Sequence, residues 1–136
     1  MPRFVLLYHD CPPEFGRPSH WDLMLEHGQA LRTWAIYQLP CDWDSARALT
    51  ALLYPACPKL ADGNEVAAEE LPDHRLAYLE IEGPLTGNRG AVCRVAAGEY
   101  EPRDCGTDAE AWMFAGEVMR GVVSIREGRL RLVALE

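Results

Sequence analysis

The stretch HWDLMLEHGQALRTWAI, residues 20–36, decides the fold class of this chain. Polar and large apolar residues alternate in its first part, as they do along a half-buried β-strand. The letters His27-Gly28-Gln29 are typical of a tight turn, and Ala30–Ile36 is rich in strand-forming residues. The stretch therefore predicts an antiparallel hairpin with two unlike faces. One face carries Trp21, Leu23 and Leu25, and the other carries His20, Asp22, Met24 and Glu26.

Similar short segments continue outward from this hairpin, separated by runs rich in glycine and proline. We expect further strands at Arg3–His9, Glu65–Leu71, Arg75–Ile81, Ala91–Tyr100, Trp112–Val118, Val122–Arg126 and Arg129–Leu135. The loops between them include Asp10–Ser19, which holds three prolines, and the glycine-rich Gly83–Gly90. Many short strands joined by tight turns are typical of small all-β folds.

A helix is expected only at Ser45–Tyr54. The apolar residues Ala46, Leu49 and Leu53 recur there at helical spacing. We expect this face to pack on the core rather than to bind a partner. Asp44 precedes the run and is a plausible N-cap.

These elements predict a mainly β domain, of the β-rich α+β kind, that spans residues 1–136 as one unit. About eight strands with one or two short helices favour a small, closed or nearly closed β-barrel, because closure removes exposed strand edges. The expected barrel core holds large apolar residues. They are Trp21, Leu23, Leu25, Trp34 and Leu79.

The composition favours a soluble, cytoplasmic protein with no membrane partner. No apolar run approaches the roughly 18 residues that span a bilayer. The five cysteines are odd in number and include no Cys-x-x-Cys pair, which indicates free thiols in a reducing compartment. The formal net charge of −8 argues against a broad, non-specific DNA-binding surface. It leaves room for a local basic site.

His9, His20 and Asp22 form the pattern with the most chemical content. Side chains two residues apart on a strand share a face and lie roughly 6.5–7 Å apart, so His20 and Asp22 can converge on one cation. His9 ends the preceding strand and can add a third ligand if the two strands are neighbours. Imidazole with carboxylate suits Mn²⁺, Fe²⁺ or Zn²⁺. The alternative is that the histidines are ordinary surface or hydrogen-bonded residues. Among the cysteines, Cys11 is the one near these residues in the sequence, although its spacing is not a standard ligand spacing.

Four blocks of residues, in a fixed order along most of the chain, carry a resemblance to a known family. They are His9-Asp10 with His20–Glu26, Leu31–Ala35, Asp73–Tyr78 with Glu82-Gly83, and Gly90–Val92 with Gly98–Glu101. Together they resemble the 3′-phosphoesterase domain of bacterial DNA ligase D and its stand-alone relatives. That family has a small β-barrel fold and uses Mn²⁺ to remove a ribonucleoside or a phosphate from DNA 3′ ends during repair.

The resemblance implies a cofactor, a substrate and roles for individual residues. It implies a divalent metal, with Mn²⁺ expected first and Zn²⁺, Co²⁺ or Fe²⁺ as other options, and a nucleic-acid 3′ end or other phosphoester as substrate. A DNA ligase or other repair proteins would be separate partners. His9, His20 and Asp22 match the metal ligands, while His74 and Tyr78 match residues that contact the scissile phosphate. His74 is expected to hydrogen-bond the phosphate or protonate the leaving group. On a regular strand, His74 and Tyr78 would share a face.

Two cationic positions of the family are different in this chain. The family has an arginine two residues after the aspartate, where this chain has Met24, and a lysine shortly after the Trp-Ala pair, where it has Tyr37-Gln38. A loop arginine can bring its guanidinium to a bidentate phosphate contact. Arg89 is therefore the expected catalytic replacement, ahead of Arg32 and Arg75. The alternative is that Arg89 is a turn residue in water.

Two other functions remain open from the sequence. The first is a module of the same fold that binds a metal or a nucleic-acid end without catalysis, which the loss of the arginine at Met24 favours. The second is a non-haem Fe(II) oxygenase site, in which two histidines and one carboxylate hold the metal. That site would use His20, Asp22 and His74 and would not need His9.

Overall fold

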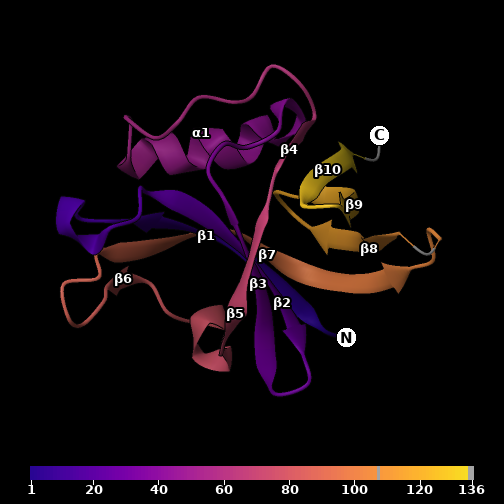
Figure 1. Ribbon diagram of the computed structural model, residues 1–136, viewed down its shortest axis with the longest axis horizontal. Helices are drawn as coiled ribbons and strands as arrows, with labels where there is room; N and C mark the ends of the chain where they lie inside the picture. The colour runs from indigo at the N-terminus through magenta and orange to yellow at the C-terminus, as the bar shows by residue number, and fades with distance from the viewer. Residues whose placement is uncertain (107, 135–136) are drawn as a thin grey trace.

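The computed structural model describes residues 1–106 and 108–134, and its strands form one antiparallel sheet (Figure 1). The strands are β1 (Arg3–Asp10), β2 (His20–His27), β3 (Ala30–Ile36), β4 (Glu65–Ala67), β5 (Glu69–Arg75), β6 (Gly83–Pro84), β7 (Ala91–Arg103), β8 (Ala109–Gly116), β9 (Arg120–Arg126) and β10 (Arg129–Ala134). The helices are α1 (Asp44–Leu53) and three 3₁₀ turns, η1 (Pro13–Phe15), η2 (Cys41–Trp43) and η3 (Leu76–Leu79). The predicted mainly β class is confirmed, with ten strands among the described residues rather than about eight.

The sheet runs in the order β4-β10-β9-β8-β7-β1-β2-β3-β5, with β6 added beside β7. Its two end strands, β4 and β5, follow one another in the chain and are separated only by Ala68. They run as one long segment across the front of the molecule (Figure 1). The first part of this segment pairs with β10 and the second with β3, so it bridges the two edges of the curled sheet. The hydrogen-bonded path itself does not close among the described residues, and a closed barrel is not confirmed.

The hairpin predicted from residues 20–36 is confirmed as β2 and β3. Leu23 lies opposite Trp34 in the ladder, and Gly28 takes the left-handed backbone (φ 64°) that the tight turn requires. The last hairpin, β9–β10, turns on Glu127 and Gly128, both of which have positive φ as in a type I′ turn. The final strand predicted at Arg129–Leu135 is confirmed as far as Ala134, and Leu135 lies outside the described residues.

The central strands β1 and β2 are buried on both faces, and each face has its own apolar cluster. The larger cluster takes Trp21, Leu23, Leu25 and Trp34, as expected for the core. The smaller cluster contains Val5, Leu7, Met24, Leu31, Tyr78, Leu79 and Val92. Leu79 is therefore buried, but on the opposite face from the predicted core. The two clusters follow from the alternation of side chains along β1 and β2.

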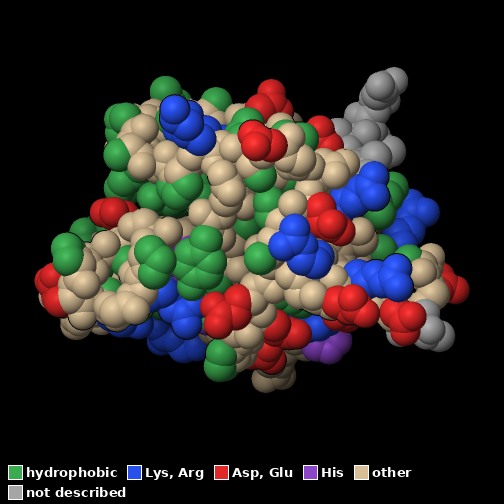
Figure 2. Space-filling view, turned by 45° about the horizontal axis from the view of Figure 1, so that its top comes forward, with side chains coloured by type: hydrophobic (Ala, Val, Ile, Leu, Met, Phe, Trp, Pro, Cys, Tyr) green, Lys and Arg blue, Asp and Glu red, His purple; other side chains and the backbone are tan. Residues whose placement is uncertain are grey.

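Helix α1 buries only part of the face predicted to pack on the core, because Ala46 is buried but Leu49 and Leu53 are not. Ala46 and Thr50 are buried, whereas Leu49, Leu52 and Leu53 are 41%, 77% and 68% exposed. Figure 2, which brings the α1 side of the molecule forward, shows apolar side chains at the surface there. The indole Nε1 of Trp21 donates to Thr50 Oγ1 at 3.0 Å, so a small polar residue, not a leucine, fastens the helix to the sheet.

The N-terminus of α1 also differs from the expectation. The helix begins at Asp44, the residue before it is Trp43, and no side chain caps it by a hydrogen bond. Asp44 is therefore the first helical residue rather than the N-cap. Its carboxylate can still favour the positive end of the helix dipole from within the first turn.

The strand predicted at Arg75–Ile81 is wrong. Strand β5 ends at Arg75, and the chain then makes the 3₁₀ turn η3. Two consecutive residues of the turn, Tyr78 and Leu79, are both buried in the smaller cluster. A strand would have sent them to opposite faces of the sheet, so covering this cluster favours a turn. By contrast, the strand expected at Glu65–Leu71 is confirmed by β4 and β5.

No helix within residues 1–106 and 108–134 is both long enough and apolar enough to cross a membrane. All five cysteines have free thiols.

Candidate metal centre

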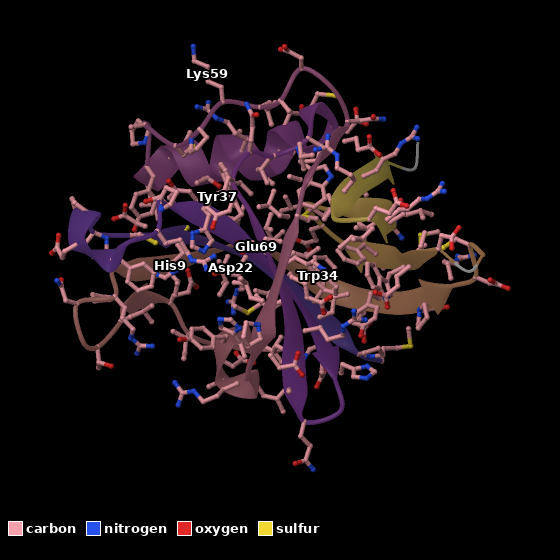
Figure 3. The ribbon with its side chains drawn as sticks, in the orientation of Figure 1. His9, Asp22, Trp34, Tyr37, Lys59 and Glu69 are labelled. Atoms are coloured by element: carbon pink, nitrogen blue, oxygen red, sulfur yellow. The ribbon has the colours of Figure 1, made fainter. Side chains whose placement is uncertain are left out.

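Strand register brings the three predicted ligands together. His9, near the end of β1, lies directly opposite His20, the first residue of β2. Residues that are directly opposite in an antiparallel ladder share a face, and Asp22 shares it too because it follows His20 by two. All three are buried, with 8%, 2% and 4% of their surfaces exposed. Figure 3 shows His9 and Asp22 side by side.

The ring of His20 is held by a backbone carbonyl. Its Nδ1 lies 2.8 Å from the carbonyl oxygen of Pro18, which can only accept a hydrogen bond, so Nδ1 carries the proton. The neutral ring therefore has its lone pair on Nε2. That nitrogen lies 3.1 Å from Asp22 Oδ1.

His9 is fixed in a similar way from the opposite side. Its Nε2 donates to the backbone oxygen of Arg89 at 2.6 Å, which leaves the Nδ1 lone pair facing Asp22 Oδ2 at 4.0 Å. Arg89 can approach because Gly90 follows it with a φ of 87°. A Cβ at Gly90 would collide with the backbone oxygen of Asp10. Glycine is thus required where this loop meets the end of β1.

These contacts aim two nitrogen lone pairs at one carboxylate. Lone pairs repel a carboxylate unless a cation, either a proton or a metal ion, lies between them. Asp22 Oδ1 is buried and accepts no hydrogen bond from any described residue. Burial lowers the pKa of His20, but the nearby Asp22 carboxylate favours the protonated ring and outweighs this, so the pKa is raised. Two imidazoles, each oriented by a backbone carbonyl, and a carboxylate fit a divalent ion such as Mn²⁺, Fe²⁺ or Zn²⁺.

Cys11 offers a second donor set at the same place. One donor atom each from His9, Cys11 and His20 lies within 4.8 Å of the others, a group that leaves out Asp22. Asp22 meets the two histidines with different oxygens, whereas Cys11 Sγ lies 3.9 Å from Nδ1 of His20. That nitrogen is already bound to Pro18. Burial, followed by the charges of Asp22 and Asp10, raises the pKa of the Cys11 thiol to about 11. We therefore assign the better fit to Asp22.

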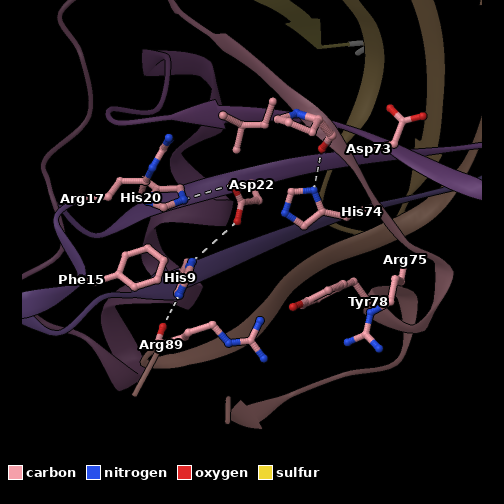
Figure 4. Close-up of a pocket in the computed structure, with 12 residues that line it drawn as sticks. His9, Phe15, Arg17, His20, Asp22, Asp73, His74, Arg75, Tyr78 and Arg89 are labelled. Atoms are coloured by element: carbon pink, nitrogen blue, oxygen red, sulfur yellow. Dashed lines mark hydrogen bonds and ion pairs between the residues drawn. The ribbon is translucent and has the colours of Figure 1, made fainter. Parts of the chain in front are cut away.

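The three residues form the floor of an open pocket of about 410 Å³ (Figure 4). The remaining wall residues come from the β1–β2 loop, from β5 and η3, and from the loop before β7. They are Phe15, Arg17, Leu71, Pro72, Asp73, His74, Arg75, Tyr78 and Arg89. The site residues predicted from the sequence thus line one pocket: His9, His20, Asp22, His74, Tyr78 and Arg89.

The ring of His74 is held by a backbone carbonyl in the same way as the ring of His20. Its Nδ1 lies 2.9 Å from the carbonyl oxygen of Pro72, two residues earlier, just as His20 binds Pro18. The neutral ring of His74 therefore has its lone pair on Nε2, which Figure 4 shows turned toward the pocket. His74 and Tyr78 were expected to share a face of one regular strand, but β5 ends at Arg75 and Tyr78 lies in the turn η3. The turn still brings their rings into edge contact, with 5.6 Å between centroids.

The arginines considered as replacements occupy different places. Arg75 and Arg89 line the pocket, but Arg32 lies outside it, stacked over Trp34 and paired with Glu110. Arg89 is anchored by its own loop, because Nε and Nη2 donate to the backbone and side-chain oxygens of Thr86 at 2.7 and 3.1 Å.

Met24 and Gln38, which stand where the resembled family has cations, do not line the pocket. Met24 is 1% exposed and belongs to the smaller cluster under η3. The Gln38 amide donates to the backbone oxygen of Lys59 at 3.0 Å. Lys59 lies near α1, away from His9 and Asp22 (Figure 3). A cation for the pocket must therefore come from other residues.

The sequence analysis did not single out Phe15 and Arg17, which line the pocket, or Tyr37, which contacts both His20 and Arg17. Phe15 packs edge-on against His9 at 5.3 Å between ring centroids, Tyr37 packs against His20 at 5.4 Å, and Arg17 binds Tyr37. One signal was available for Arg17: it is the only cationic residue in Asp10–Ser19, the loop that joins His9 to His20. The repeated Pro-x-His pattern, at Pro18 and Pro72, was also visible in the sequence.

No protein-family model matches this chain, and no curated protein matches it.

Proposed function

We propose that this domain is a divalent-metal-dependent phosphoesterase that acts on nucleic-acid 3′ ends, with His9, His20 and Asp22 as ligands and Mn²⁺ as the preferred ion. One observation carries the proposal. Two imidazole lone pairs, each set by a backbone carbonyl, converge on a buried carboxylate at the floor of a pocket with arginine in its walls. Zn²⁺, Co²⁺ and Fe²⁺ suit the same donors. The arginines favour an anionic substrate.

Several side chains of the pocket would contact a bound phosphoester, each with a different role. When bound, the metal ion supplies Lewis-acid polarisation of a phosphate oxygen and makes water a better nucleophile. When its ring is neutral, His74 can accept a proton at Nε2. Once protonated, it can donate that proton to the phosphate or to the leaving oxygen. The hydroxyl of Tyr78, which lines the pocket, would supply a neutral hydrogen bond. Arg75 and Arg89 counter the negative charge that develops in the transition state.

The acidic surface is consistent with recognition of an end rather than of a long duplex. The net charge of −8 opposes binding along a DNA backbone, whereas three arginines, Arg17, Arg75 and Arg89, line one pocket. The proposal includes a DNA ligase or another repair protein as a separate partner. It also includes a reducing, cytoplasmic setting, which the five free thiols support.

A non-catalytic module that binds a metal or a nucleic-acid end is the second candidate. The buried Met24 favours it, because that position contributes no cation to the pocket. The oxygenase alternative is less well supported. Its ligand set leaves out His9, whose Nδ1 faces Asp22 Oδ2 at 4.0 Å.

The test is hydrolysis of a duplex primer–template carrying one 3′-terminal ribonucleotide or a 3′-phosphate, with Mn²⁺ added. Turnover that is absent in His20→Ala supports the phosphoesterase. In an active protein, Arg89→Ala should lower turnover by about 10²-fold if Arg89 supplies the missing charge. Mn²⁺ binding measured by calorimetry, without turnover, would favour the non-catalytic module. Absence of Mn²⁺ binding would contradict both the phosphoesterase and the metal-binding module.

A further inference from the structure

We propose that Arg17 is the residue that grips the anionic group of the substrate beside the metal centre. The inference rests on the phosphoesterase function proposed above and assigns its ligand class, a phosphate-type anion with two adjacent oxygens free to accept hydrogen bonds. Arg17 belongs to the loop between β1 and β2 and lines the pocket together with His20 and Asp22 (Figure 4).

The hydrogen bonds of Arg17 leave its binding edge available. Both of its polar contacts within the described chain use the same atom, Nη1, which donates to Tyr37 Oη at 2.9 Å and to Glu69 Oε1 at 3.2 Å. The other edge of the guanidinium, formed by Nε and Nη2, is the one that binds two phosphate oxygens side by side. Arg89 is the reverse case, because Thr86 already occupies both its Nε and its Nη2. Of the two, Arg17 is the better bidentate donor.

The partners of Arg17 tie its position to the metal ligands. Tyr37 binds the guanidinium with its hydroxyl and packs its ring against His20. Glu69 lies in the same row of the sheet as Asp22, with Ala35 between them in register with both. Tyr37, which binds Arg17, thus contacts the proposed ligand His20. Glu69, its other partner, lies in the same cross-strand row as the proposed ligand Asp22.

Glu69 does not cancel the charge of Arg17. The two side chains are 34% and 56% exposed, and surface ion pairs contribute little energy in water. The pair therefore serves mainly to set the direction of the guanidinium. An incoming phosphate would displace water from the remaining edge rather than break a buried ion pair.

An anion-binding role and a purely structural role predict opposite changes in metal affinity. If Arg17 binds the anion, its positive charge slightly opposes the metal, so Arg17→Ala should bind Mn²⁺ alone equally well or more tightly. If Arg17 only fastens the β1–β2 loop to Glu69, its loss frees the loop beside His20, and Mn²⁺ affinity should fall.

The experiment is calorimetric titration of Mn²⁺ into the full chain, with and without inorganic phosphate kept below the solubility limit of manganese phosphate. Phosphate should strengthen Mn²⁺ binding by the wild type. In Arg17→Ala this strengthening should fall about tenfold or more. Arg17→Lys should recover part of it. The control is Arg120→Ala, which removes the same charge from an exposed position at the start of β9; it should behave as the wild type.

Each contrary result has a separate meaning. Weaker Mn²⁺ binding by Arg17→Ala without phosphate, or unchanged phosphate strengthening in that variant, overturns the role of Arg17 and leaves the metal centre standing. Wild-type protein that binds Mn²⁺ without any phosphate effect also overturns it. Wild-type protein that does not bind Mn²⁺ overturns the metal centre and, with it, the inference.

Discussion

Asp22 Oδ1 lies 3.1 Å from Nε2 of His20, the ring nitrogen that has no proton when the imidazole is neutral. Pro18 fixes this arrangement by taking the Nδ1 proton of His20. A structural ion pair and a metal site both use such a contact, but they respond differently to removal of the carboxylate charge. The distinction can be tested with a single isosteric substitution.

Asp22→Asn should separate metal binding from stability. We expect Mn²⁺ affinity to fall by more than the roughly 10–100-fold that the loss of an outer-shell partner costs. At mildly alkaline pH without metal, the amide can donate to the His20 lone pair, so the stability should stay constant or rise by about 1 kcal/mol. Urea unfolding with a chelator measures the second quantity, and calorimetry the first. Unchanged Mn²⁺ affinity with a loss of more than about 2 kcal/mol would instead identify a structural ion pair.

Gly90→Ala should damage both the fold and the site. A non-glycine residue in this backbone conformation costs about 1–3 kcal/mol, and the Cβ would also collide with the oxygen of Asp10. The displaced Arg89 carbonyl would release His9, so Mn²⁺ affinity should fall as well. Gly87→Ala is the matched control, because Gly87 has a φ of 72° but open space where a Cβ would lie. If both variants lose equal stability and keep Mn²⁺ affinity, the close approach at Gly90 does not orient His9.

Leu23→Ala should destabilise the protein by roughly 2–5 kcal/mol, because it opens a cavity in the larger core cluster. Leu53→Ala, on the outer face of α1, should change stability by no more than about 0.5 kcal/mol. Leu53 is 68% exposed and Leu23 is fully buried. Urea unfolding of the two variants side by side is the measurement. Equal losses would show that α1 packs through its leucines after all.

Glu110 provides a prediction of pH dependence away from the pocket. Hydrogen bonds from Arg32 are the main cause that holds the pKa of this carboxyl below its usual 4.5. A lowered carboxyl pKa stabilises the fold above the unfolded value, and this stability is lost as the pH falls through the folded value. Glu110→Gln should therefore be less stable than the wild type at neutral pH, and the difference should vanish in acid.

The control for that series is Glu101→Gln, an exposed carboxyl on β7. It should follow the wild-type pH profile at every pH. A difference in stability between Glu110→Gln and the wild type that persists below the folded pKa would contradict this. It would show that loss of the hydrogen bonds from Arg32 to Glu110 does not cause the pH dependence.

The central hairpin and the shared face of His20 and Asp22 were predictable because strand periodicity is a local property. Alternation alone placed Trp21 and Leu23 on one face and His20 and Asp22 on the other, and the structure agrees. Helix α1 was only partly predictable. Its extent follows from the residues, but which face is buried depends on what it meets. Thr50 meets Trp21, so the leucines lie outside.

The sequence by itself determined the mainly β class, the hairpin and the pairing of His20 with Asp22, because each depends on residues close together in the chain. Only the tertiary structure decided the rest of the pocket. Arg17 meets Glu69, and His9 meets the Arg89 carbonyl, across 52 and 80 positions of sequence. Such contacts depend on the register of distant strands and on glycine at position 90. No local pattern encodes where two remote segments meet, because their approach is set by packing of the whole sheet.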